Sequence, residues 1–344
     1  MTRHFSAASL LCGLLVTAVA HSNANAQADL NTDERSAFEL LPASCLAVAQ
    51  MPHPDQLLTT LTEHNVWKKV QQQPQYNEAI SNPGYMMFLG IRTHIETQIG
   101  MKWREAYDTL LGGGITIAFD PETEGVVALV RSADADKLQS TANTLIELGR
   151  ADARSKGNEP LPEDEYREVT VYGKDDARFA IVGPWIVMSN KDELGKKVLD
   201  TLLDGARASI QDSDNFAAAR KSISGEPTVW SWVDLGTIRD AGLAKGLEPN
   251  QTENPIAELL FGGVLTNLRQ TPYVTASLYV TGKSTRLELS APHDNQWVEE
   301  FREYWFGPDG NGTADPPLDT ESTIFSISTH RKVSEMWLRA GDLF

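Results

Sequence analysis

Alternating apolar and polar residues in the middle of the chain predict a pair of antiparallel strands. The alternation runs through residues 115–119, an acidic turn follows at 120–125, and residues 126–130 return as a second strand. A helix with one apolar face then begins near Ser132 and ends at Gly149. This stretch therefore predicts a ββα unit.

Three further strands and a well-marked helix are predicted next. The strands cover 168–172, 178–182 and 185–189, after a polar segment, 151–167, that is typical of an exposed loop. Asn190 followed three residues later by Glu193 has the pattern of a capping box, and Gly205 is placed to end the helix. Ser213 is placed to cap the next helix.

The clearest hairpin lies near residue 280. The apolar positions of its first strand alternate strictly with Tyr273, Thr275, Ser277 and Tyr279, and they are Val274, Ala276, Leu278 and Val280. Such alternation predicts an antiparallel sheet with the apolar set buried and the other face in solvent. The predicted fold class is therefore α+β, with antiparallel sheets and helices packed on one face.

A strand followed directly by a helix recurs along the chain. It begins at Cys45, at Thr228 and at Ser322. The repeated strand-helix units and the ββα unit together indicate an internal duplication. The predicted organisation is a leader at 1–26, a first α+β unit at 27–225 and a second at 226–344.

The N-terminus has the three parts of a cleavable signal peptide. Arg3 precedes an apolar run from Leu10 to Ala20, and small residues then lead to Ala24 and Ala26. Cleavage is predicted after Ala26, with Ala20 as the other candidate site. The run is shorter than the ~20 residues that span a bilayer, and no later segment approaches that length. An exported protein, periplasmic or extracellular, without a transmembrane segment after cleavage, is predicted.

Charge and cysteine content restrict the partners and the chemistry. The formal net charge of −17 argues against nucleic acid as a partner. Removal of the leader would discard Cys12 and leave Cys45 alone, so an intramolecular disulfide is excluded in the processed chain. Cys45 lies in an apolar stretch and is predicted to be buried and inert.

No motif indicates a catalytic, cofactor or metal site. The glycine run 112–114 lacks the Gly-Lys-Ser/Thr of a phosphate loop and precedes a strand instead of a helix. The histidines are scattered singly, which gives no zinc pattern. The calcium-like segment 309–315 lacks the glycine and glutamate that such a loop requires. No cofactor is predicted, and an enzyme is the less favoured class.

An aromatic stripe is the one suggestive feature. A predicted helix after Asp294 carries Trp297, Phe301, Tyr304 and Trp305. At this spacing a stripe usually packs into a core. If it is exposed, Trp297, Phe301 and Trp305 are candidate contacts for a partner or an apolar ligand.

The chain also resembles a bacterial family. The resemblance lies in residues 179–190, in Leu41-Pro42, in 214–219 and in 228–234. The family consists of exported cell-envelope proteins classed as a domain of unknown function. The resemblance implies an envelope location and no known activity. Its members are generally longer, which implies that the second unit is incomplete relative to them.

Three functions remain open. The first is a non-enzymatic envelope protein that binds or organises another component through its repeated sheet. The second is an extracytoplasmic hydrolase whose site is assembled from distant residues, which a cleft with convergent acidic or histidine side chains would favour. The third is a carrier of an apolar small molecule or lipid, which a closed apolar cavity lined by Trp230, Trp232 or Trp297 would favour.

Overall fold

The structure, a computed structural model, describes residues 33–343 apart from 206, 243–253, 283 and 308–329. The predicted leader with Ala24 and Ala26, the turn at 309–315 and the strand that begins at Ser322 lie outside the described residues.

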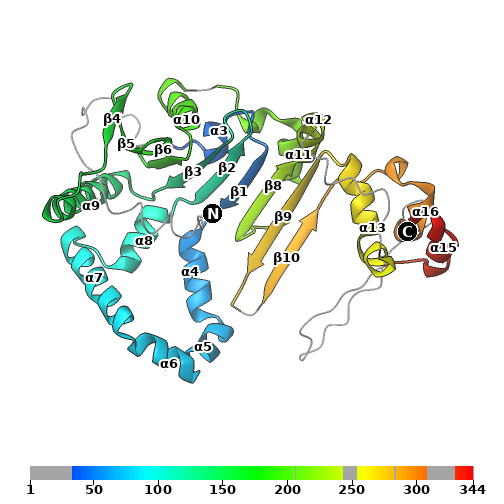
Figure 1. Ribbon diagram of the computed structural model, residues 1–344, viewed down its shortest axis with the longest axis horizontal. Coiled ribbons are helices and arrows are strands. Elements are labelled where there is room, and N and C mark those ends of the chain that lie inside the picture. The colour runs from blue at the N-terminus through cyan, green and yellow to red at the C-terminus, as the bar shows by residue number, and fades with distance from the viewer. Residues whose placement is uncertain (1–32, 206, 243–253, 283, 308–329, 344) are drawn as a thin grey trace. The chain divides into compact units, whose positions relative to one another are not determined.

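The described strands form one sheet with antiparallel pairing (Figure 1). Their hydrogen-bonded order is β10-β9-β8-β1-β2-β3-β7-β6-β5-β4. The strands are β1 (Ala47–Met51), β2 (Ile115–Asp120), β3 (Gly125–Arg131), β4 (Glu163–Tyr166), β5 (Val169–Lys174), β6 (Ala177–Val182), β7 (Trp185–Ser189), β8 (Val229–Asp234), β9 (Tyr273–Val280) and β10 (Thr285–Ser290).

Helices accompany this sheet, and the predicted α+β class is confirmed. The α-helices are α3 (Ala37–Leu40), α4 (Pro54–Glu63), α5 (Asn65–Gln71), α6 (Pro74–Ser81), α7 (Pro83–Ile99), α8 (Trp103–Leu111), α9 (Ala135–Ser155), α10 (Asp192–Asp204), α11 (Asp214–Lys221), α12 (Leu235–Asp240), α13 (Pro255–Gln270), α14 (Glu303–Phe306), α15 (Val333–Leu338) and α16 (Ala340–Leu343). Short 3₁₀ turns are η2 (Ile210–Asp212), η3 (Asn295–Trp297) and η4 (Glu300–Arg302).

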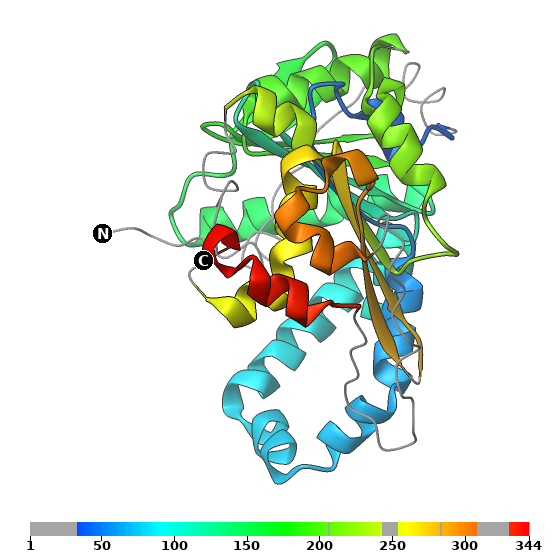
Figure 2. The same cartoon turned by 90° about the vertical axis from the view of Figure 1, so that its right-hand side faces the viewer.

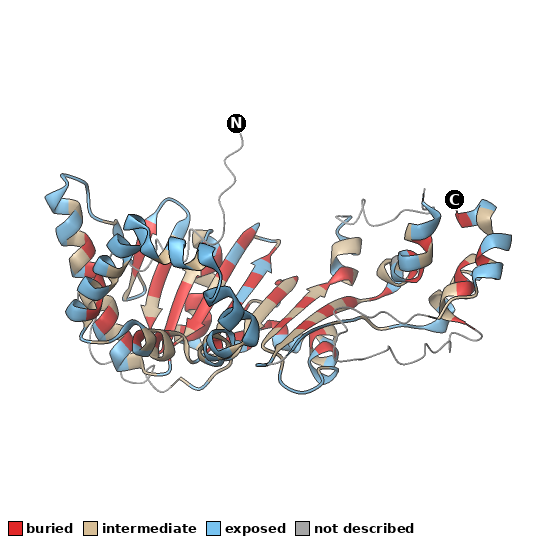
Figure 3. Cartoon of the chain, turned by 90° about the horizontal axis from the view of Figure 1, so that it is seen from below, coloured by how far each residue is buried: buried red, intermediate tan, exposed pale blue. Residues whose placement is uncertain are grey.

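The chain divides into two compact units. Unit 1 takes the described residues up to Ser231 together with Ala276–Glu288, and unit 2 takes Trp232–Thr275 together with the described residues from Leu289 onward. Buried residues are concentrated on the strands and on the helix faces turned toward them (Figure 3).

Helices pack on both faces of the sheet in unit 1. Ile186 of β7 clusters with Ala106 and Leu110 of α8 and with Leu138 of α9. Its neighbour Val187 points to the other face, because successive side chains of a strand alternate, and that face is covered by α10. The helices thus cover more of the sheet than the hairpin pattern predicts.

The buried face of β9 is the opposite of the predicted one. Tyr273, Thr275 and Ser277 are buried, while Val274 and the apolar residues in step with it are half-exposed. The hydroxyl of Thr275 donates to the Ser290 carbonyl at 3.3 Å, which removes part of the cost of burying it. Alternation separates the two faces of a strand, but the neighbouring elements decide which face is covered.

Helix caps agree with the sequence at α11 and differ at α10. The Ser213 hydroxyl caps α11 by accepting the Phe216 amide at 3.3 Å, as predicted. The Asn190 side chain instead accepts the Val126 amide at 2.6 Å, so Lys191 is the N-cap of α10 and the capping-box prediction is wrong. The Asn190 side chain is used to extend the pairing of β3 and β7. Gly205 ends α10 with a φ of 86°, as predicted.

The predicted loop at 151–167 contains regular structure. Helix α9 continues past the buried Gly149 to Ser155, and β4 occupies Glu163–Tyr166. Strand β4 has no alternation of apolar and polar residues, because three of its four residues are acidic. Ion pairs from Arg150 to Glu163 and from Arg178 to Asp164 compensate for their charge.

The helix predicted after Asp294 is broken into η3, η4 and α14. The break turns polar groups inward. The Arg302 guanidinium binds Glu258 of α13 at 2.9 Å, and the Tyr304 hydroxyl donates to the same carboxylate at 2.9 Å. Gly262 and Gly263 allow α14 to lie this close to α13, because a Cβ at Gly263 would overlap the Trp305 ring.

Candidate functional site

The predicted aromatic contacts lie in unit 2, in three different environments. Phe301 and Trp305 pack against the core formed by Tyr304, Met336 and Leu343. The Arg331 guanidinium lies 3.6 Å from the centroid of the Trp305 ring. Trp297 lies on η3 and is half-buried. Phe301 and Trp305 therefore support the packing of unit 2, and the structure does not gather the three side chains into one open face.

A polar cavity of about 600 Å³ lies beside the C-terminal end of α10. Acidic and basic side chains come together around it. Its charged lining consists of Arg35, Glu39, Asp204, Arg207 and Asp212.

Most of these charged groups serve local structure. The Arg35 guanidinium binds Asp33 at 2.8 Å and donates to the last carbonyls of α10, at Thr201 and Leu202. Glu39 and Asp212 close capping boxes by accepting the amides of Ser36 and Ser209. These three side chains thus stabilise helix ends.

Asp204 belongs to an ion-pair network with arginines. The Arg167 guanidinium binds both Asp204 and Asp200, and Arg207 binds the same two carboxylates. Hydrogen bonds from Arg167, followed by those from Arg207, lower the pKa of Asp204 to about 2. A general acid needs a pKa near the working pH. Asp204 is therefore unsuited to proton transfer near neutral pH.

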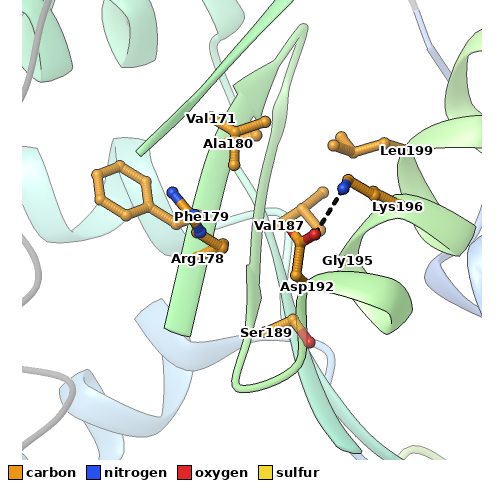
Figure 4. A pocket seen from close by; sticks show the side chains of 10 residues that line it. All are labelled: Val171, Arg178, Phe179, Ala180, Val187, Ser189, Asp192, Gly195, Lys196 and Leu199. Atoms are coloured by element: carbon orange, nitrogen blue, oxygen red, sulfur yellow. Dashed lines mark ion pairs between the residues drawn. The ribbon is translucent and has the colours of Figure 1, made fainter. Parts of the chain in front are cut away.

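A second cavity, between α10 and strands β5–β7, is too small for a ligand (Figure 4). Its volume is about 10 Å³, which is room for about one water molecule. Asp192 and Lys196 form an ion pair at 2.5 Å beside it, and the Lys196 ammonium lies 5.3 Å from the centroid of the Tyr166 ring. Neither cavity is lined by Trp230, Trp232 or Trp297.

Metal and thiol chemistry find no support in the described part of the chain. Within it, no group of three or more His, Cys, Asp or Glu side chains is placed to hold a metal ion. Cys45 is buried, as predicted. Burial, reinforced by Asp120 and opposed by Lys197, raises its thiol pKa to about 12, so the nucleophilic thiolate is scarce.

The arm, which we define as α4–α7 (Pro54–Ile99), is held at both of its ends (Figure 1). At the first end, Arg104 of α8 donates to the Asp55 carbonyl at 3.0 Å, and the Tyr107 hydroxyl donates to the Pro54 carbonyl at 3.2 Å. At the second, Glu96 accepts the Trp103 amide at 3.1 Å and pairs with Lys102 at 3.3 Å. Between these two attachment points, the four helices follow a bent path (Figure 2).

Apolar side chains of the arm are exposed over its whole middle part. No residue in the described range 61–91 is buried. On α7, Met86 is 59%, Met87 68%, Phe88 56% and Ile91 52% exposed. Leu61, Val66, Trp67, Val70 and Tyr85 are exposed as well. Full burial of such a side chain stabilises a protein by about 1.5–3 kcal/mol. The arm therefore leaves a large apolar surface in water.

The first half of α7 is apolar on every side. Residues 83–91 contain no charged side chain, and all but the half-buried Leu89 are exposed. A helix that is apolar all round is normally enclosed. The arm as a whole is close to neutral, with three Lys or Arg against four Asp or Glu, in a chain whose net charge is −17.

A second apolar patch lies on the sheet. Phe119 of β2 pairs with Val126 of β3, and both are exposed, as is Ile117 on the same face. This end of the face lies beyond the cluster in which α8 and α9 cover Val130 and Ile186. Unit 1 thus presents apolar residues on both the arm and the open end of the sheet.

The sequence contains a signal for the arm that periodicity alone does not use. A run of nine uncharged, mostly apolar residues lacks a polar face, so it does not fit a surface helix. The region is helical. The run does not predict exposure, because the same run would suit a core helix.

Comparisons with known proteins identify no family. No family model matches the chain, and no curated protein matches it. Among solved structures, crystal form I of TP0453, a Treponema protein, aligns with a TM-score of 0.39 and 9% identity, covering 89% of this chain and 96% of that one. Crystal form IV of TP0453 aligns with a TM-score of 0.36 and 10% identity, covering 74% and 79%. At these TM-scores the similarity supports no conclusion about function.

Among the described helices, none is both long and apolar enough to cross a membrane.

Proposed function

We propose that this chain is a non-enzymatic protein of the bacterial cell envelope that binds another envelope protein through its arm. The exposure of the apolar residues of α7 carries the proposal. Exposed apolar surface of this extent is typical of an interaction site, and Met-rich surfaces adapt readily to a partner.

The shape of the apolar surface favours a groove on the partner. A flat surface would cover one side of α7 and leave Met86, Met87 or Phe88 in water. An apolar groove encloses a helix, which is a recurring mode of helix recognition. The near-neutral charge of the arm suits such an apolar contact within an otherwise acidic chain.

The hydrolase hypothesis receives less support. The carboxylates of the polar cavity cap helices or pair with arginines, and Asp204 has a lowered pKa. The carrier hypothesis keeps one supporting observation, since the arm could also bind a lipid, and the experiment therefore has to separate the two partners.

Photo-crosslinking in the producing bacterium tests the proposal. A photoreactive residue replaces Met87, and the control places it at Thr97, an exposed polar position of the same helix. We expect Met87 to give one dominant adduct with an envelope protein, weakened by Phe88→Gln, and Thr97 to give none. An adduct with lipid alone would favour the carrier. A crosslink to the chain's own sheet, or no adduct, would contradict the proposal.

A further inference from the structure

Among the described strands, β10 lies at an edge of the sheet and is partly apolar. It stands at one end of the strand order, with β9 as its neighbour. All of its residues except the half-buried Glu288 are exposed, and Leu287 is 63% and Leu289 70% exposed. An edge strand exposes backbone donors and acceptors that can pair with another strand.

The two edges of the sheet differ in charge. At the other edge, β4 carries Glu163, Asp164 and Glu165 in succession. Antiparallel pairing of β4 with a second β4 would place acidic side chains opposite one another, which is destabilising. Strand β10 carries one base and one acid, Arg286 and Glu288, on either side of Leu287.

The sequence of β10 is self-complementary around Leu287. If a second β10 pairs with it antiparallel and the two-fold axis passes at Leu287, Arg286 of each chain faces Glu288 of the other. Leu287 then faces Leu287, and Leu289 faces Thr285. Both oppositely charged pairs and the apolar pair are of the kind that stabilises a sheet.

The charged side chains are already on one face of the free strand. Arg286 and Glu288 lie 3.4 Å apart, and the Arg286 guanidinium lies 4.0 Å from the centroid of the Tyr279 ring. A second strand would complete an alternating square of four charges. The contact is isologous, the commonest type in homodimers, because each surface binds a copy of itself.

We propose that the protein forms a two-fold homodimer in which two β10 strands pair antiparallel, centred on Leu287. The partner is a second copy of this chain, and the charge pattern of β10 specifies the register. This interface is separate from the arm and does not depend on what the arm binds.

Charge-reversal variants test the proposal by analytical ultracentrifugation of the purified protein over a concentration series. We expect the wild type to dimerise. Arg286→Glu alone places acids opposite acids, and Glu288→Arg alone places bases opposite bases, so each should weaken dimerisation at least tenfold. A mixture of the two variants restores both oppositely charged pairs, and we expect a heterodimer. The double variant R286E/E288R should dimerise by itself.

Leu287→Lys supplies a second test, since it places like charges at the two-fold axis and should give a monomer. Circular dichroism establishes that each variant is folded. A monomeric wild type, unchanged dimerisation of both single variants, or a mixture that stays monomeric would overturn the proposal.

Discussion

Individual charged residues of this protein mostly stabilise local structure. Arg35 binds the carbonyls at the end of α10, Glu39 and Asp212 close capping boxes, and Glu258 binds Arg302 and Tyr304 inside unit 2. Breaking a buried pair such as Glu258–Arg302 leaves an uncompensated charge. Such roles explain why acidic residues in this chain need not indicate chemistry.

The Asp204 network gives a pH-dependent prediction. The pKa of Asp204 is lowered to about 2 in the folded protein, against about 3.9 for an unperturbed aspartate. Its pairing therefore stabilises the fold fully above the unfolded pKa, and this contribution is lost as the pH falls from about 4 to about 2.

We expect Asp204→Asn to lower the free energy of unfolding at pH 7 and to differ less from the wild type as the pH falls. Urea denaturation of both proteins between pH 7 and pH 2.5 measures this. A difference that stays constant over that range would show that the loss is not electrostatic.

At the level of single residues, the sequence predicts a residue's role well where that role depends only on its immediate neighbours in the chain. The Ser213 cap, the Gly205 helix end and the burial of Cys45 were predicted. Asn190 was not, because its partner is the Val126 amide, 64 residues away in the sequence. Contacts between distant segments leave no local pattern.

The periodicity of apolar residues indicated where helices and strands form, but it did not indicate which of them are covered by other elements. Prolines at the first turns of α4, α6 and α7 mark the helices of the arm. The strand β4 was missed because its residues are acidic, and the helix after Asp294 was predicted whole although it is broken. The exposure of the arm does not follow from its sequence, because exposure depends on what packs against an element.

Removing the exposed part of the arm should leave the sheet intact. None of residues 61–91 is buried, and the anchors at Arg104, Tyr107 and Glu96 lie outside that range. We expect a variant with Leu61–Ile91 replaced by a short Gly/Ser linker to keep its melting temperature and to bind much less of an apolar dye.

The matched control keeps the arm and changes Met86, Met87 and Phe88 to Gln. It should reduce dye binding in the same direction without altering chain length. Loss of the cooperative unfolding transition in the deletion variant alone would mean that the arm contributes to the core.

For the whole molecule, the repeated strand-helix unit is visible in the strand order. Strands β1 and β8 are neighbours in the sheet, and each is followed by a helix, α4 and α12. The third helix of the pattern, α15, is present, while the strand predicted before it lies outside the described residues. Each of the two compact units combines segments that are distant in the sequence.

Export is the prediction that concerns the whole chain. If the leader is cleaved after Ala26, the processed protein begins at Gln27, and Ala24→Leu should block processing, because the A-x-A site needs small residues. Intact-mass measurement of protein from the envelope fraction reads this directly. A first residue of His21 would indicate cleavage after Ala20, and an unprocessed chain in the cytosol would contradict export.

The position of the arm in the topology has an evolutionary consequence. Strands β1 and β2 are antiparallel neighbours, with Met51 opposite Ile115, a pair that two residues are enough to connect. Residues 52–114 therefore occupy the position of a hairpin loop. Apart from α8 and Ile99 of α7, which pack in the core, this segment can lengthen, shorten or change its apolar side chains without shifting the register of any strand. If the arm binds a partner, selection can therefore change that partner while the scaffold stays the same.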